Sequence, residues 1–327
     1  MHSLKQSGSQ AIQIWLASLA LLIVSIILLG GYTRLSGSGL SIVQWQPITG
    51  VIPPLNHTQW LEAFEQYKLF PEFQLVNYDM SLSKFKFIFM VEFLHRLLAR
   101  ILVLVFLLPL LYFYRTKKIP QQDLWQYILM LGVLASQGCM GWYMVKSGLI
   151  KDPSVSHYRL SAHLMIAIAL YSMVFYKLVS KASVPKHLFK LRLVILLLLT
   201  YLQTFIGALV AGLKAGLIYN TFPLMGNAII PYELSITTFH DPVTAQFVHR
   251  QLAYGIFIFI IYISYLLCRS GRFVQALLLI LAGLVQILLG IITLLWVVPL
   301  SFALLHQLGA VALISVIIFL YTNDRCS

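Results

Sequence analysis

The sequence predicts an all-α integral membrane protein whose eight transmembrane helices form two pseudo-symmetric four-helix bundles. Of its 327 residues, 60% are hydrophobic and only 10% are charged, and the mean hydropathy is +0.86, which excludes an ordinary soluble domain. Apolar segments of about 20 residues recur along the chain, and each is long enough for a helix to cross a hydrocarbon core of about 30 Å. Strands of a membrane barrel would be about half as long and would alternate in polarity.

Eight segments have this length and composition, and they define the predicted helices. In order along the chain they are residues 12–32, 85–114, 124–144, 158–179, 188–209, 243–267, 274–296 and 300–321.

The net charge of +13 is distributed as expected for orientation in a membrane and not for a nucleic-acid partner. If the N-terminus is cytoplasmic, the inner loops and span ends hold 12 basic residues against Asp123 and Asp324, and the outer ones hold 8 against 7 acidic residues. This excess is the positive-inside pattern. The inner basic residues are Lys5, Arg115, Lys117, Lys118, Lys177, Lys181, Lys186, Lys190, Arg192, Arg269, Arg272 and Arg325.

The chain contains an internal repeat, which predicts two halves, residues 1–180 and 181–327. The string F-x-H-R-x-L-A occurs at 93–99 and again at 247–253. Further pairs keep the same order, and their offsets fall only where loops differ in length. They are residues 30–40 with 207–217, Gln137-x-x-x-Gly141 with Gln286-x-x-x-Gly290, and His163 with His306. Four spans per half indicate a parallel repeat.

The first half has a longer outer loop, at about residues 33–84. Trp60, Phe64 and Tyr67 have helical spacing there, which predicts a short helix at the membrane interface. An ordinary polar loop with aromatic anchors is the alternative.

Four histidines are the main candidates for a functional site. His95, His163, His249 and His306 all lie on even-numbered spans, in the outer half of the bilayer. An ionisable side chain inside a membrane is costly and is therefore a functional candidate. Two histidines per half suggest two haems, each with its iron between two imidazoles. The alternatives are buried, hydrogen-bonded histidines or a zinc site, although no cysteine or carboxylate set completes the latter.

An arginine directly follows two of these histidines. Arg96 and Arg250 are candidate partners for haem propionates, because guanidinium groups pair well with carboxylates. Snorkelling is one alternative. Another is an ion pair within one helix, since Glu92 lies four residues before Arg96.

Glu92 distinguishes the first half from the second. It is the only acidic residue inside a predicted span, it shares a helix face with His95, and its counterpart is Gln246. General acid–base catalysis requires a titratable group. We therefore expect chemistry in the first half and an electron-transfer or structural haem in the second, with a purely structural ion pair to Arg96 as the alternative.

The strings of this chain resemble those of the haem A synthase family, in its proteobacterial and mitochondrial branch, over nearly the whole length. They include GYTRLSGSGLS at 31–41, Trp45, Pro47, Gly50, Pro53, Pro54, EFLHR at 92–96, Gln137-Gly138, GWYMVKSGL at 141–149, YRL at 158–160, Ala211-Gly212, YNTFPLM at 219–225, QFVHR at 246–250, LGIITL at 289–294 and His306-Gln307. Some other members carry a cysteine pair in the first outer loop. This chain has none there, so a thiol role in that loop does not apply.

The resemblance implies oxidation of the C8 methyl group of haem O to a formyl group. It implies haem O as substrate at His95 and His163, haem b as cofactor at His249 and His306, and Glu92 as the catalytic carboxylate. It also implies a bacterial inner membrane protein. The implied partners are the lipid bilayer, a haem O synthase, a haem-copper oxidase or its assembly factors, an electron acceptor and, as an option, further copies of the chain; nucleic acid is not among them.

Two other functions would also use four histidines. One is a di-haem cytochrome b-type protein that only transfers electrons, and the other is a haem transporter or chaperone. Neither explains why Glu92 occurs in one half alone.

Overall fold

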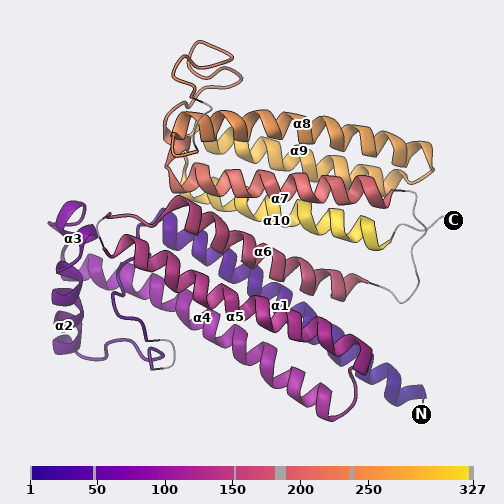
Figure 1. Cartoon of the computed structure of the whole chain (residues 1–327), viewed down its shortest axis with the longest axis horizontal. Coiled ribbons are helices and arrows are strands. Elements are labelled where there is room, and N and C mark those ends of the chain that lie inside the picture. Colours follow the sequence, from indigo (N-terminus) through magenta and orange to yellow (C-terminus); the bar gives the residue numbers. More distant parts are fainter. Residues whose placement is uncertain (1, 47–48, 151, 181–188, 236–238, 324–327) are drawn as a thin grey trace. The chain divides into compact units, whose positions relative to one another are not determined.

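The described part of the chain is almost entirely helical. The computed structural model describes residues 2–46, 49–150, 152–180, 189–235 and 239–323. Within these ranges there is no strand, only an isolated antiparallel bridge between Met225 and Ala228. The predicted all-α fold class is therefore confirmed (Figure 1).

Eight of the helices in the described ranges are long and apolar enough to cross a membrane. They are α1 (His2–Leu35), α4 (Leu82–Arg115), α5 (Leu124–Gly148), α6 (His157–Val179), α7 (Lys190–Gly212), α8 (Pro242–Arg269), α9 (Phe273–Leu295) and α10 (Leu300–Thr322). The eight predicted spans are thereby confirmed, with ends that differ by several residues. The predicted start of the fifth span at 188, together with Pro47, Lys181, Lys186, Asp324 and Arg325, lies outside the described residues.

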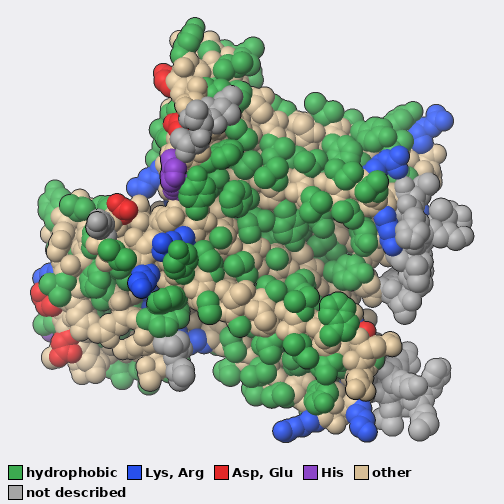
Figure 2. Space-filling model, in the orientation of Figure 1, with side chains coloured by type: hydrophobic (Ala, Val, Ile, Leu, Met, Phe, Trp, Pro, Cys, Tyr) green, Lys and Arg blue, Asp and Glu red, His purple; other side chains and the backbone are tan. Residues whose placement is uncertain are grey.

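The outer faces of these helices are apolar. Figure 2 shows hydrophobic side chains over the helical surfaces, with lysine and arginine side chains toward the helix ends and loops. Large side chains more than half exposed include Leu104, Leu108, Leu198, Ile258 and Leu288. In water such surfaces would drive aggregation, so they indicate contact with lipid.

The chain divides into two compact units, Met1–Leu170 and Tyr171–Ser327. The boundary between them falls inside α6. The division after residue 180, which the repeat predicts, remains a prediction.

In the second unit, α7 packs against α8 and α10, and α9 packs against the same two helices, which closes a four-helix bundle. Buried apolar side chains fill one end of this bundle. They belong to the start of α7 and α9 and the end of α8 and α10, and they include Phe189, Leu193, Leu196, Ile256, Ile260, Ile263, Leu267, Ala276, Leu279, Leu313, Ile317 and Leu320.

The corresponding end of the first unit is also closed by packing. Trp15 of α1 is buried against Phe106 and Phe113 of α4 and Tyr127 of α5, with ring centroids 5.5–5.7 Å apart. Its indole nitrogen donates to the carbonyl of Val105 at 2.8 Å. This aromatic group joins three helices at the end away from the long outer loop.

The outer loop of the first unit contains the predicted short helix, α2 (His57–Lys68), followed by the unpredicted α3 (Pro71–Leu75). Phe64 and Tyr67 of α2 stack on Phe85 of α4 with ring centroids 4.9 and 5.3 Å apart. Helix α4 has 34 residues and is therefore about 50 Å long, well beyond a hydrocarbon core of about 30 Å. Its extended first turns thus provide the surface on which α2 packs.

Glu72 of α3 is a buried carboxyl group within this outer structure. The hydroxyl of Tyr67 donates to its Oε2 at 2.9 Å, and Asn77 Nδ2 donates to that hydroxyl at 2.8 Å. Burial raises the pKa of Glu72 to about 7; the hydrogen bond from Tyr67 opposes this, and the charge of Glu92 adds to it.

We predict that α2 and α3 attach less firmly as pH rises through neutrality, and that Glu72→Gln removes this dependence. An unfolded glutamate loses its proton near 4.5, whereas the folded one keeps it until about 7. The raised pKa therefore stabilises the folded state fully below pH 4.5, and this stabilisation is lost as pH rises through about 7. Hydrogen exchange of residues 57–77 at several pH values measures how firmly α2 and α3 are attached. The control is Glu65→Gln, which changes an exposed carboxylate of α2. Equal pH dependence in wild type and Glu72→Gln would contradict the prediction.

Candidate functional site

Each of the four predicted histidines packs on a glycine of the preceding membrane helix. The pairs are Gly30 with His95, Gly141 with His163, Gly207 with His249, and Gly290 with His306. In every pair, a Cβ built on the glycine would lie only 2.9–3.0 Å from the Cε1 atom of the imidazole. Side chains do not tolerate so short a contact. The repeated glycines therefore have a common physical reason, which is to let a ring lie directly on a helix backbone.

The glycine–histidine pairs lie toward one end of their unit. In the second unit, Gly207 and Gly290 are near the ends of α7 and α9, whereas His249 and His306 are near the starts of α8 and α10. The apolar cluster occupies the opposite ends of the same four helices. The histidines thus share one level of the bundle.

The histidine pair of the second unit has the spacing that a doubly ligated iron requires. The ring centroids of His249 and His306 are 6.4 Å apart, and the ring planes are inclined by 84°. An iron held between two imidazoles by bonds of about 2 Å leaves the ring centres roughly 6 Å apart. The donors present therefore fit a haem with two axial histidines.

The first unit brings its two histidines together as well. His95 and His163 are close enough to interact electrostatically. The Nδ1 atoms of both rings are buried and have no hydrogen-bond partner. A buried polar atom without a partner is costly, so its presence points to a site built for a further group. Among the described residues, no three metal-ligating side chains gather as a closed zinc site would need.

Glutamine side chains contact two of the rings. One of these glutamines, Gln137, belongs to a repeated string noted above, and the other, Gln203, was not predicted. Gln203 Nε2 lies 3.1 Å from His249 Nδ1 and donates to the His249 carbonyl at 2.9 Å. Gln137 Nε2 lies 3.4 Å from His163 Nε2. The signal for Gln203 was available, because Gln203-x-x-x-Gly207 is a third copy of the Q-x-x-x-G string.

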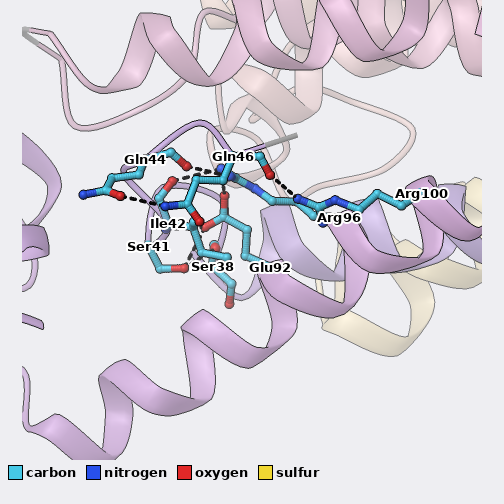
Figure 3. A network of polar contacts seen from close by, with 8 residues as sticks. All are labelled: Ser38, Ser41, Ile42, Gln44, Gln46, Glu92, Arg96 and Arg100. Carbon is cyan, nitrogen blue, oxygen red and sulfur yellow. Dashed lines mark hydrogen bonds and ion pairs between the residues drawn. The ribbon is translucent and has the colours of Figure 1, made fainter. Parts of the chain in front are cut away.

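The loop after α1 binds one oxygen of the Glu92 carboxylate, and Arg96 of α4 binds the other, as Figure 3 shows. Glu92 is buried on α4. Its Oε2 accepts hydrogen bonds from the Ser41 hydroxyl at 2.7 Å and the Ile42 backbone N–H at 2.9 Å. Its Oε1 accepts from Arg96 at 2.6 Å. The ion pair that the spacing of Glu92 and Arg96 allowed is thus present, together with two further donors.

Two arginines fasten the same loop to α4. Arg96 donates to the carbonyls of Ile42 at 2.9 Å and Gln44 at 3.3 Å, and Arg100 donates to that of Gln46 at 2.8 Å. A cavity of about 470 Å³ borders both arginines, so a ligand group has room beside this network.

The second unit repeats this attachment of a loop to a helix, with an amide side chain in place of the carboxylate. Arg250 donates to the carbonyls of Tyr219 at 2.8 Å and Leu224 at 3.2 Å, and Tyr219 occupies the position of Ile42 in the repeat. Gln246, in place of Glu92, donates to that Tyr219 carbonyl at 3.0 Å.

The two halves also differ at the hydroxyl donor. Ser41, which donates to Glu92, is matched by Ile218 in the second half. The carboxylate and its hydroxyl donor therefore occur together in the first half and are both absent from the second.

The role of Arg96 and Arg250 toward propionates remains a prediction. In this structure, Arg96 is occupied by Glu92 and the loop. Arg250 is occupied by loop carbonyls through its two terminal nitrogens, while its buried Nε has no partner.

Fold and site together define a multi-pass membrane protein with a pair of histidines within the membrane helices of each unit. The family model for cytochrome oxidase assembly proteins matches residues 13–318. The chain therefore belongs to that family. Relatives named haem A synthase come from Rickettsia bellii (strain RML369-C), Rickettsia felis and Rickettsia rickettsii (strain Sheila Smith). They are 46%, 45% and 44% identical to it, and each alignment covers 94% of this chain and 96% of the relative.

We predict that Gly207→Ala displaces the His249 ring and lowers haem binding in the second unit by about tenfold or more, as expected when ligand orientation is lost. The matched control is Gly255→Ala on α8, where an added Cβ meets no atom within 4 Å. That variant should bind haem normally. Haem content per protein, from the pyridine haemochrome spectrum, measures both. Normal haem content in Gly207→Ala would show that the glycine contact is dispensable.

Proposed function

We propose that this chain is a haem A synthase, an oxidoreductase that converts haem O to haem A by oxidising the C8 methyl group to a formyl group. The product would serve terminal oxidase biogenesis. One observation carries the proposal: of two matching histidine sites, only one has a buried carboxylate beside it, Glu92. The names of the relatives and the family description agree with this reaction.

The two halves have different tasks in this proposal. Residues 1–180 bind the substrate haem O through His95 and His163, and residues 181–327 bind haem b as cofactor through His249 and His306. Support comes from the half-to-half comparison, since the second site has Gln246 where the first has Glu92. Haem b, when bound, supplies one-electron redox chemistry.

The proposed location is a bacterial inner membrane, with the N-terminus in the cytoplasm and both sites toward the outer face. The positive-inside count supports this orientation. The histidines lie near the start of α6, α8 and α10, the ends that this orientation assigns to the outside.

Oxidation of a methyl group to a formyl group removes four electrons, as two hydroxylations followed by loss of water would do. Glu92 would accept a proton from the methyl group or from an attacking water. Three donors use three of the roughly four lone-pair sites of the carboxylate, so one site on Oε1 is open to accept the proton. Rotation of the Ser41 hydroxyl would free a second site, on Oε2.

The reaction needs a source of haem O, an acceptor for electrons and a consumer of haem A. A haem O synthase would supply the substrate, and a haem-copper oxidase or its assembly factors would receive the product. An electron-transfer cytochrome b or a haem transporter would use the same histidines, but neither would need the carboxylate and its three donors.

We predict that Glu92→Gln lowers haem A formation by roughly 10²–10⁴-fold, the usual effect of losing acid–base catalysis. The change is nearly isosteric and makes the first half imitate the second, so the protein should insert normally and retain haem b. Haem O should accumulate. Extraction and chromatography of haems from membranes that also contain a haem O synthase measure the outcome.

The outcome that contradicts this role is a wild-type rate with normal protein and haem content. Glu92 would then be only a partner for Arg96. If Glu92→Gln does not accumulate, Glu92→Asp, which keeps the carboxylate but shortens it, replaces it.

A further inference from the structure

One helical turn before each histidine-facing glycine, three helices carry a glutamine and one carries an isoleucine. The residues are Gln137 before Gly141, Gln203 before Gly207, Gln286 before Gly290, and Ile26 before Gly30. Residues four apart lie on the same face of a helix, so each is placed beside the same imidazole as its glycine. Ile26 and Gln203 are equivalent positions of the repeat, with the offset that relates Gly30 to Gly207.

The three glutamines contact their imidazoles. Gln203 Nε2 lies 3.1 Å from His249 Nδ1 and 3.4 Å from His249 Nε2, whereas Gln137 Nε2 lies 3.4 Å from His163 Nε2. Gln286 does so through its backbone carbonyl, which lies 3.2 Å from His306 Nδ1.

His95 is the exception. It is the one of the four that has no glutamine beside it, because Ile26 offers no hydrogen-bonding side chain. The Nδ1 atoms of His95 and His163 are both buried without a partner, whereas those of His249 and His306 each have a contact.

The glutamines also have an unused acceptor. The Oε1 atoms of Gln137, Gln203 and Gln286 are all buried and have no hydrogen-bond partner. A histidine that binds iron through Nε2 carries a proton on Nδ1, and that proton needs an acceptor. An amide that turns about its last bond exchanges its donor for its acceptor. Gln203 Nε2 lies 3.1 Å from His249 Nδ1, so this turn would bring Oε1 to accept the proton, in exchange for the bond that Nε2 donates to the His249 carbonyl.

Resting on the function proposed above, we propose that Gln203 is the positioning residue that makes His249 a permanent ligand of haem b. Ile26 withholds the same support from His95, so the substrate iron has one weakly held, exchangeable ligand. Hydrogen bonds to a metal-binding imidazole fix its orientation and raise its basicity, and their loss typically weakens metal binding about 10–100-fold. A cofactor must stay bound, whereas a substrate must enter and its product must leave. Ile26, the one apolar residue among the four equivalent positions, lies in the half where haem must be exchanged.

The first test uses protein made in a host without haem O, so that haem b alone is bound. Gln203→Ile, which copies Ile26, should transfer haem b to apomyoglobin about 10–100-fold faster than wild type. It should also raise the reduction potential, because a less basic imidazole stabilises ferric iron less. Leu202→Ile, on the exposed face of the same helix, is the matched control and should change neither quantity. Gln203→Met, of similar length but without an acceptor, replaces Gln203→Ile if that variant does not accumulate.

The reciprocal test uses protein loaded with haem A. Ile26→Gln should release haem A to apomyoglobin about 10–100-fold more slowly than wild type, and Ile26→Leu should release it at the wild-type rate.

The results separate this inference from the proposed function. Wild-type haem b transfer and potential in Gln203→Ile or Gln203→Met, or unchanged haem A release in Ile26→Gln, would overturn the inference and leave the proposed reaction untouched. Faster haem b loss in Gln203→Ile, together with no haem A in wild-type protein coexpressed with a haem O synthase, would overturn the reaction while supporting the role of Gln203.

Discussion

The packing of an imidazole ring directly on a helix backbone is the contact on which the rest of this structure depends. It occurs four times, and each time a glycine on the preceding helix leaves the space. Because an added Cβ would lie only 2.9–3.0 Å from the ring, the contact fixes both the closeness of the two helices and the direction of the imidazole. Buried apolar side chains fill the other end of the second unit, and the aromatic group around Trp15 closes that of the first.

The two units share this glycine–histidine contact but differ in the groups that could transfer a proton. Glu92 and its hydroxyl donor Ser41 are replaced together by Gln246 and Ile218, which removes both the carboxylate and the group that holds it. The loop attachment survives this exchange, since Arg96 and Arg250 bind equivalent carbonyls. The repeat thus preserves the structural parts and varies those suited to proton transfer.

Much of this could be predicted from the sequence, because periodicity and internal repetition are local or directly comparable signals. Eight apolar segments gave the spans, and matched strings gave the histidines and the Glu92 asymmetry. The short helix α2 followed from aromatic spacing, whereas α3 did not. The hold of Ser41 and Ile42 on Glu92 depends on a loop conformation that no periodicity encodes, and it joins residues about 50 positions apart. Gln203 could have been found, but only by comparing all four helix pairs instead of two halves.

The most direct test of the central claim is the haem composition of the purified protein after coexpression with a haem O synthase in a host that lacks haem A. The account predicts haem A together with haem b in wild type, and haem b without haem A in His95→Ala. Unchanged haem O beside haem b in wild type would contradict the proposed reaction. Haem A formation by a His95→Ala protein that has lost haem b would reverse the roles of the two halves.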